Sequence, residues 1–190
     1  MNKNRIEAFS DGVMAIILTI MVLELKVPTG DDLSSIISLA PLFLTYVLSF
    51  IYIGLYWNNH HNLFQSAEFI DGKIMWANLY LLFCISLIPV STAWAGKYPG
   101  SEWPVALYGF ILFMAGTAHY LLVHLLIKMQ NSNAVLSASI GNDWQGKISL
   151  ILYSIGIIFS FVNTTIAFLI YLSVTLIWLT PDKRFKKSKG

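Results

Sequence analysis

The first hydrophobic segment of the chain reads RIEAFSDGVMAIILTIMVLELKVP, residues 5–28. It holds only twelve consecutive uncharged residues, 12–23, between Asp11 and Glu24. A helix of twelve residues is about 18 Å long, whereas the hydrocarbon core of a bilayer is about 30 Å thick. The segment is therefore either not a membrane span, or a span whose two ends lie among protein and water instead of lipid.

The composition of the whole chain is that of an integral membrane protein. Of its 190 residues, 56% are hydrophobic, 14% are aromatic and only 12% are charged. Uncharged stretches, each long enough to cross a bilayer, cover residues 33–67, 74–96, 103–127 and 148–181. We predict an all-α integral membrane protein with one domain over residues 1–190.

The distribution of Lys and Arg favours six spans over five, because basic residues are retained on the cytoplasmic side of a membrane. If the last uncharged stretch turns at Asn163, only Lys26 and Lys97 of the 12 basic residues lie opposite the two termini. A single span there would divide the basic residues almost evenly between the two sides. We predict cytoplasmic N- and C-termini and six transmembrane helices, over residues 5–27, 41–64, 74–95, 103–128, 147–162 and 164–180.

A branched apolar stripe runs along the first predicted helix. With 100° of rotation per residue, Ile20 and Leu23 lie within about 40° of Ile16, and Thr19 lies beside them. Asp11 points away from the stripe, and an ionised Asp near the start of a helix interacts favourably with the helix dipole. Taken alone, such a stripe is also typical of ordinary core packing. A helix that longer helices shield from lipid could also line a central pathway.

Arg5, Phe9, Ser10 and Asp11 fit the pattern RxxxFSD. The pattern resembles the signature that begins the first helix in the potassium channel family of transmembrane protein 175, whose members lie in organelles of animals and in the plasma membrane of prokaryotes. The resemblance implies a multi-pass protein of a prokaryotic plasma membrane. Because FSD occurs once in the chain, it further implies one six-helix repeat that assembles as a homotetramer, with the first helix lining the central pore.

The resemblance places the pore constriction at Ile16, five residues beyond Asp11. Ile20 and Leu23 correspond to further apolar layers, and the hydroxyl of Thr19 to a ring of weak oxygen ligands. The function that this implies is passive conduction of potassium ions through a hydrophobic constriction, which can gate by dewetting. The chain has no TVGYG filter sequence. The alternative function is a proton-permeable or proton-coupled cation channel or transporter.

The motif is interpreted as the anchor of the pore helix. A simpler interpretation is that Asp11 only begins the helix, through local hydrogen bonds, and that Arg5 is only a positive charge on the cytoplasmic side. The run YWNNHH, residues 56–61, and Asn78 are expected at the cytoplasmic ends of the second and third helices, level with the motif. We therefore predict that Arg5, Phe9, Ser10 and Asp11 anchor the helix, with partners His60, His61 and Asn78.

Three acidic residues follow the apolar stripe in the sequence: Glu24, Asp31 and Asp32. We expect them at the external mouth of the pore, where their field would concentrate cations. The expected partners of the chain are potassium ions, the lipid bilayer and further copies of itself.

Other classes of function lack the residues that they need. His60 and His61 are adjacent and His119 and His124 are five apart, so neither pair has the i, i+4 spacing of a zinc site on one helix. A membrane enzyme needs a clustered nucleophile, base or metal set, and a transporter needs broken helices around a midplane binding site. We expect no enzyme activity, no metal or other cofactor, and no nucleic-acid partner.

Overall fold

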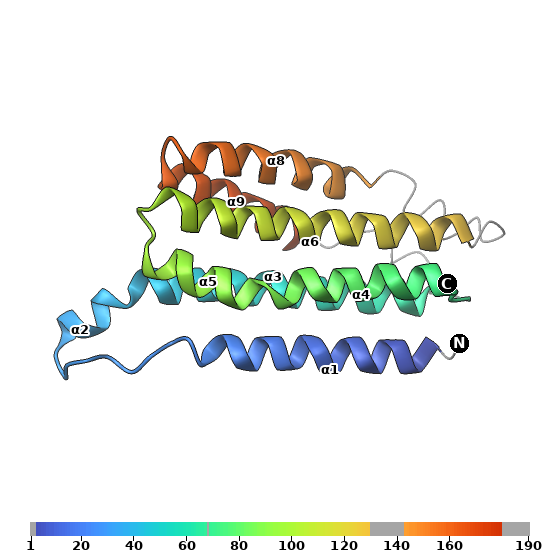
Figure 1. The fold of residues 1–190 in the computed structure, drawn as a ribbon, viewed down its shortest axis with the longest axis horizontal. Helices are drawn as coiled ribbons and strands as arrows, with labels where there is room; N and C mark the ends of the chain where they lie inside the picture. Colours follow the sequence, from blue (N-terminus) through green and yellow to red (C-terminus); the bar gives the residue numbers. More distant parts are fainter. Residues whose placement is uncertain (1–2, 68, 130–142, 180–190) are drawn as a thin grey trace.

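The computed structural model describes residues 3–67, 69–129 and 143–179, and the regular structure of these residues is helical. The helices run side by side along the long axis of the molecule (Figure 1). Their bounds are α1 (Lys3–Val22), α2 (Leu33–Ser38), α3 (Ala40–Gln65), α4 (Gly72–Ser86), α5 (Ile88–Lys97), α6 (Glu102–Met129), α8 (Trp144–Ser160) and α9 (Thr164–Leu179). The predicted all-α architecture is confirmed.

Within the described residues, three helical stretches have the length and apolar composition of a membrane span. They are Ala40–Gln65, Gly72–Lys97 and Glu102–Met129, with mean hydropathies of 1.5, 1.8 and 1.9. Helix α9 is also apolar but has 16 residues. The chain is therefore a membrane protein, and the number of six spans stays a prediction.

The first helix differs from the predicted range 5–27. Helix α1 begins at Lys3 and ends at Val22, because the chain then tightens into a turn in which the amide of Leu23 donates to the carbonyl of Ile20 at 3.0 Å. Helix cannot readily resume before Pro28, since the residue that precedes a proline disfavours helical dihedral angles. Leu23, predicted as a helical pore residue, therefore lies in the turn after α1.

The predicted helix 74–95 is divided into α4 and α5 at Leu87. Pro89 lies in the first turn of α5, and in a continuous helix its ring would clash with the carbonyl four residues earlier while offering no N–H. The amide of Leu87 instead donates to the carbonyl of Cys84 at 3.2 Å. The short helix α2 begins after Asp32, whose side chain accepts a hydrogen bond from the amide of Ser35 at 3.1 Å.

The bundle has two sides. Helix α1 lies at one edge and packs against α3, α4 and α5, whereas α6, α8 and α9 form a lobe on the other side (Figure 1). Helix α1 begins at the end of the bundle where α3 ends and α4 begins, and we call this the motif end. The opposite end, which carries α2 and the end of α5, is the far end.

A tyrosine in a glycine-lined site joins the helices of the lobe. Tyr171 of α9 is fully buried, and a Cβ atom on Gly109 of α6 or Gly156 of α8 would collide with its side chain. The Tyr171 hydroxyl lies 3.2 Å from the hydroxyl of Ser160. Small residues here let three helices approach one another closely, as is common in membrane proteins.

Candidate pore helix and its anchor

One face of α1 is buried against the bundle. Its residues recur every three or four positions, as expected for one face of a helix: Ile6, Ser10, Met14, Ile17 and Met21. Ser10 is the polar member of this face and is 0% exposed. Because buried hydroxyls in proteins are almost always hydrogen-bonded, Ser10 is the point where this face requires a specific partner.

Asn78 of α4 joins Ser10 to His60 of α3. Its Nδ2 donates to Ser10 Oγ at 2.9 Å, and its Oδ1 lies 2.8 Å from His60 Nε2. Since an amide oxygen only accepts, His60 Nε2 carries the proton in this arrangement. All three residues are at most 1% exposed. This chain of bonds connects α1, α4 and α3 inside the bundle at the motif end.

Asp11 has a different partner from those predicted. Its Oδ1 accepts a hydrogen bond from Trp57 Nε1 at 3.0 Å, and Trp57 is 46% exposed. His61, predicted to meet the motif signature, lies with its Nδ1 3.1 Å from Oε1 of Glu7, a residue between the signature positions. Trp57 precedes His60 and His61 by three and four residues, so helical spacing placed all three on one face of α3. That spacing was the signal by which Trp57 could have been found.

Arg5 and Phe9 are exposed in the single chain. Phe9 is 54% exposed and Arg5 belongs to the same exposed class, so the anchoring roles predicted for them stay predictions. Lys3 contributes instead, because its Nζ donates to the carbonyl oxygens of Gln65 and Ala67, each at 3.2 Å. A cation at these carbonyls complements the negative end of the α3 dipole.

Three residues of the predicted pore stripe lie on another face of α1, and the fourth, Leu23, lies in the turn after it. Ile16, Ile20 and Leu23 are 59%, 49% and 76% exposed, and Thr19 is exposed too. Thr19 Oγ1 donates to the carbonyl of Ile16 at 2.9 Å, which leaves the lone pairs of its oxygen available. Because α1 lies at the edge of the bundle, this face is directed out of the protomer (Figure 1).

The three acidic residues predicted at the pore mouth are all exposed: Glu24, Asp31 and Asp32. They belong to the segment between α1 and α2, and this segment lies at the far end of the bundle (Figure 1). Hydrogen bonds from the side chain of Ser34, and then from the side chain and amide of Ser35, lower the pKa of Asp32 from 3.8 to about 2. Asp32 therefore keeps its negative charge throughout the physiological pH range.

The part of the exposed face of α1 from Ile16 to Ile20 carries apolar groups and one hydroxyl, and the exposed Phe9 and Arg5 lie nearer the start of the helix. In the described part of the chain, no group of three or more His, Cys, Asp or Glu residues lies close enough together to hold a metal ion. A ring of branched side chains can exclude water from a narrow passage, and hydroxyl oxygens can replace part of the hydration of a cation. The chemistry that this face supports is ion dehydration and passage.

Comparisons with known proteins agree on one family. Residues 5–89 match the family described as endosomal/lysosomal potassium channel TMEM175. A protein of Chryseobacterium sp. (strain P1-3), named a potassium channel, is 50% identical over 188 residues, which cover 99% of this chain and 98% of that protein. A chicken protein, named endosomal/lysosomal proton channel TMEM175, is 40% identical over 128 residues, which cover 64% of this chain but 25% of that protein.

A solved structure extends the likeness to the fold. It is the crystal structure of a lysosomal potassium-selective channel TMEM175 homolog from Chamaesiphon minutus. It matches with a TM-score of 0.79 and 27% sequence identity, over 93% of this chain and 96% of that one. The arrangement of helices described above is therefore shared along almost the whole chain.

Proposed function

The chain belongs to the TMEM175 family of ion channels, and we propose that it is a potassium-permeable cation channel of a prokaryotic plasma membrane. Ions pass down their gradient through a central pore lined by α1. Four copies of the chain form this pore, and both termini of each copy lie in the cytoplasm.

The observation that carries the proposal is the contrast between the buried and the exposed face of α1. One face is buried and fixed through Ser10, whereas the other presents Ile16, Thr19 and Ile20 outside the protomer. Lipid is a poor cover for this second face, because the uncharged stretch 12–23 is too short for a hydrocarbon core about 30 Å thick. Other copies of the same face are a better cover, since a closed ring leaves only its narrow interior to water and ions.

The proposed assembly follows from the geometry of one helix. A single α1 cannot enclose a pore, so the chain must be multiplied by closed symmetry. Leu23→Cys provides the test, because Leu23 is 76% exposed at the end of α1, whereas the native Cys84 is buried and reacts poorly. Cross-linking should give a ladder that ends at four subunits. Ion flux from an isolated monomer would contradict the assembly.

In the proposed pore, the four Ile16 side chains meet at the axis and form the constriction. A cation that crosses this ring loses hydration without receiving ligands, so the ring is an energetic barrier as well as a steric one. The Thr19 hydroxyls offer oxygen ligands about one helical turn later, and Ile20 adds a second apolar layer. Leu23, in the turn after α1, forms a wider layer toward the mouth.

The test is ion flux through the purified chain in liposomes, measured with potassium and with sodium gradients. Ile16→Asn should admit water, raise the flux and weaken the preference for potassium, whereas Thr19→Val should chiefly lower that preference. Ile151→Asn is the matched control, because Ile151 of α8 is 58% exposed, as Ile16 is 59% exposed, but lies in the lobe away from α1. If Ile16→Asn and the unmodified chain conduct alike, the pore assignment is wrong.

The alternative of proton permeation has one specific observation in its favour, the name proton channel carried by the chicken relative. Proton permeation is tested in the same liposomes, by imposing a pH gradient without potassium and following the internal pH with a dye. We expect potassium flux to exceed proton flux at neutral pH. A proton flux that equals the potassium flux and follows the same Ile16→Asn dependence would establish the alternative.

A further inference from the structure

His61 of α3 connects that helix to α1 through a carboxylate. Its Nδ1 lies 3.1 Å from Oε1 of Glu7, and the two side chains are 38% and 16% exposed. Both residues lie at the motif end, where α1 begins and α3 ends. Water, and with it protons, can therefore reach this pair, unlike the buried anchor formed by Ser10, Asn78 and His60.

The hydrogen bonds of His61 define its protonation state. A carboxylate only accepts, so Nδ1 carries a proton that it donates to Glu7. On the other side of the ring, the amide nitrogen Nε2 of Gln65 lies 2.9 Å from His61 Nε2. Because an amide nitrogen only donates, His61 Nε2 accepts and carries no proton. In this arrangement the imidazole is neutral, and its Nε2 has the lone pair that can bind a further proton.

One added proton changes every contact of this imidazole. The bond to Glu7 then joins two opposite charges, where before it joined a charge and a neutral ring. Nε2 becomes a donor, so the exposed amide of Gln65 must turn its oxygen toward it. The Trp57 ring stacks on His61 with a centroid separation of 6.1 Å, near the limit at which an aromatic face attracts a cation. Trp57 also donates to Asp11, so both effects act between α3 and α1.

The charges that surround His61 in the described structure come mainly from α1. The charged and titratable side chains at this end of α1, α3 and α4 are Lys3, Arg5, Glu7, Asp11, His60, Asp71 and Lys73. Lys3 is bound at the last carbonyls of α3, and Arg5 points about 160° away from Glu7 around α1. Asp71 caps α4 by accepting from the amide of Ile74 at 2.9 Å. Helix α9, which also packs against α3, has no charged residue, and the charge of α5 lies at the far end.

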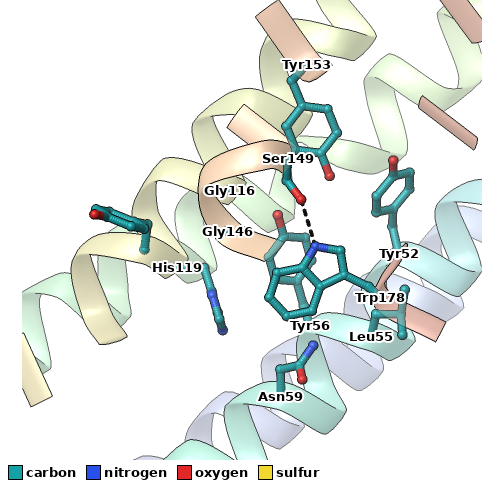
Figure 2. A pocket seen from close by; sticks show the side chains of 11 residues that line it. Tyr52, Leu55, Tyr56, Asn59, Gly116, His119, Gly146, Ser149, Tyr153 and Trp178 are labelled. Atoms are coloured by element: carbon teal, nitrogen blue, oxygen red, sulfur yellow. Dashed lines mark hydrogen bonds between the residues drawn. The ribbon is translucent and has the colours of Figure 1, made fainter. Parts of the chain in front are cut away.

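The other three histidines of the chain lack these features. His60 is fully buried. His119 is 8% exposed and lies in the lobe, among aromatic rings such as that of Trp178 (Figure 2). His124 is exposed, but its Nδ1 lies 2.8 Å from a carbonyl of its own helix, α6. His61 is therefore the histidine that water reaches and that is also bonded to α1.

We propose that His61 is a proton-operated switch on the pore helix: a proton bound at Nε2 tightens the hold of α3 on the first turns of α1, and its loss loosens that hold. The packed state binds this proton better than a state in which α1 has moved off α3. The hold is therefore stronger at low pH and weakens as the pH rises. Histidine ordinarily changes charge between pH 5 and 8. That the sensed pH is cytoplasmic rests on the proposed function, whereas the coupling of pH to the hold on α1 does not.

Cysteine labelling of the full chain in lipid nanodiscs tests the proposal. Met14 of α1 faces the bundle and is 1% exposed, whereas the adjacent Ala15 is exposed. In a Cys84→Ala background, Met14→Cys is labelled only when α1 moves off the bundle, and Ala15→Cys measures the reactivity of a thiol at the same pH. We expect the ratio of the first labelling rate to the second to fall several-fold from pH 8 to pH 6. The readout needs no ion flux, so it is independent of the result for the pore.

Variants of the pair separate the switch from general effects of pH. Glu7→Gln and His61→Gln should each remove the pH dependence of the ratio. His61→Arg keeps a positive charge at every pH, so it should keep the ratio low at both values. His124→Gln is the matched control, because it removes an exposed histidine that does not contact α1, and it should leave the pH dependence intact. An equal ratio at pH 6 and pH 8 with His61 present would overturn the proposal, as would a pH dependence that survives in His61→Gln.

Discussion

Asn78→Ala is the substitution that tests most directly how the pore helix is held. It removes the amide between Ser10 and His60 and leaves both of those buried groups unpaired. At about 1–3 kcal/mol for each unpaired group, the loss is about 2–6 kcal/mol. In membranes the measured coupling of interhelical hydrogen bonds averages about 0.6 kcal/mol and reaches about 1.7 kcal/mol, because released groups find other partners. We therefore expect a value near the lower end, about 2 kcal/mol.

The assay is a double-mutant cycle with Ser10→Ala, read by reversible unfolding of the chain in bicelles. If the bond between Asn78 Nδ2 and Ser10 Oγ anchors α1, the two substitutions together should destabilise less than the sum of their separate effects, by about 1 kcal/mol. Asp11→Ala is the comparison, because Asp11 is bonded to a half-exposed Trp57 and should lose less than Asn78→Ala. Strict additivity, together with a larger loss for Asp11→Ala, would refute the assignment of the anchor to Ser10.

Three further outcomes are expected. Replacing Glu24, Asp31 and Asp32 by their amides should reduce potassium flux at low ionic strength and leave it unchanged at high ionic strength, because salt screens a surface field. The ion selectivity should stay unchanged. A loss of flux that is equal at both ionic strengths would contradict this prediction. The pKa of Asp32 is lowered from 3.8 to about 2, so its charge and its capping of α2 are fully present above pH 4 and are lost only as the pH falls toward 2. At an external pH of 3, Asp32→Asn should therefore still reduce the potassium flux at low ionic strength. Gly109→Ala places a methyl group against Tyr171 and should destabilise the bundle by about 1–3 kcal/mol in thermal unfolding, while the ion selectivity of the folded fraction stays unchanged.

Helical periodicity predicts which residues of α1 are exposed and which are buried, and prolines in the sequence indicate where two of the helices end. The spacing of Ile16 and Ile20 separated them from Met14 and Ile17, and the structure exposes the first pair and buries the second. Hydropathy alone predicts one helix that extends to residue 27 and another that continues past Leu87, whereas the structure ends α1 at Val22 and α4 at Ser86. Pro28 and Pro89, which lie close after these two ends, are visible in the sequence. Local backbone chemistry, not apolarity, ends a helix at such positions.

The partners of the motif were harder to predict, because they depend on how far one helix is shifted along another. Ser10 and Asp11 are adjacent, but a rotation of about 100° sends Ser10 into the bundle toward Asn78 and Asp11 toward the half-exposed Trp57. Sequence placed the motif, the run 56–61 and Asn78 at one end of the bundle. It could not rank their pairings, since a shift of one helical turn would exchange them.

Because the anchor lies near one end of α1, a tilt of the helix about Ser10 displaces its residues more the farther they lie from Ser10. Directional bonds hold α1 near Ser10, whereas beyond it the helix meets the bundle through apolar side chains such as Met14 and Met21, which can slide without breaking a bond. At 1.5 Å per residue, Ile16 lies about 9 Å and Ile20 about 15 Å from this pivot, so a tilt of about 10° moves them by about 1.6 and 2.6 Å. In a fourfold ring, opposite Ile16 side chains would then separate by about 3 Å, close to the diameter of a water molecule. In the proposed pore, a small tilt would thus be enough to wet the constriction while the pivot stays intact.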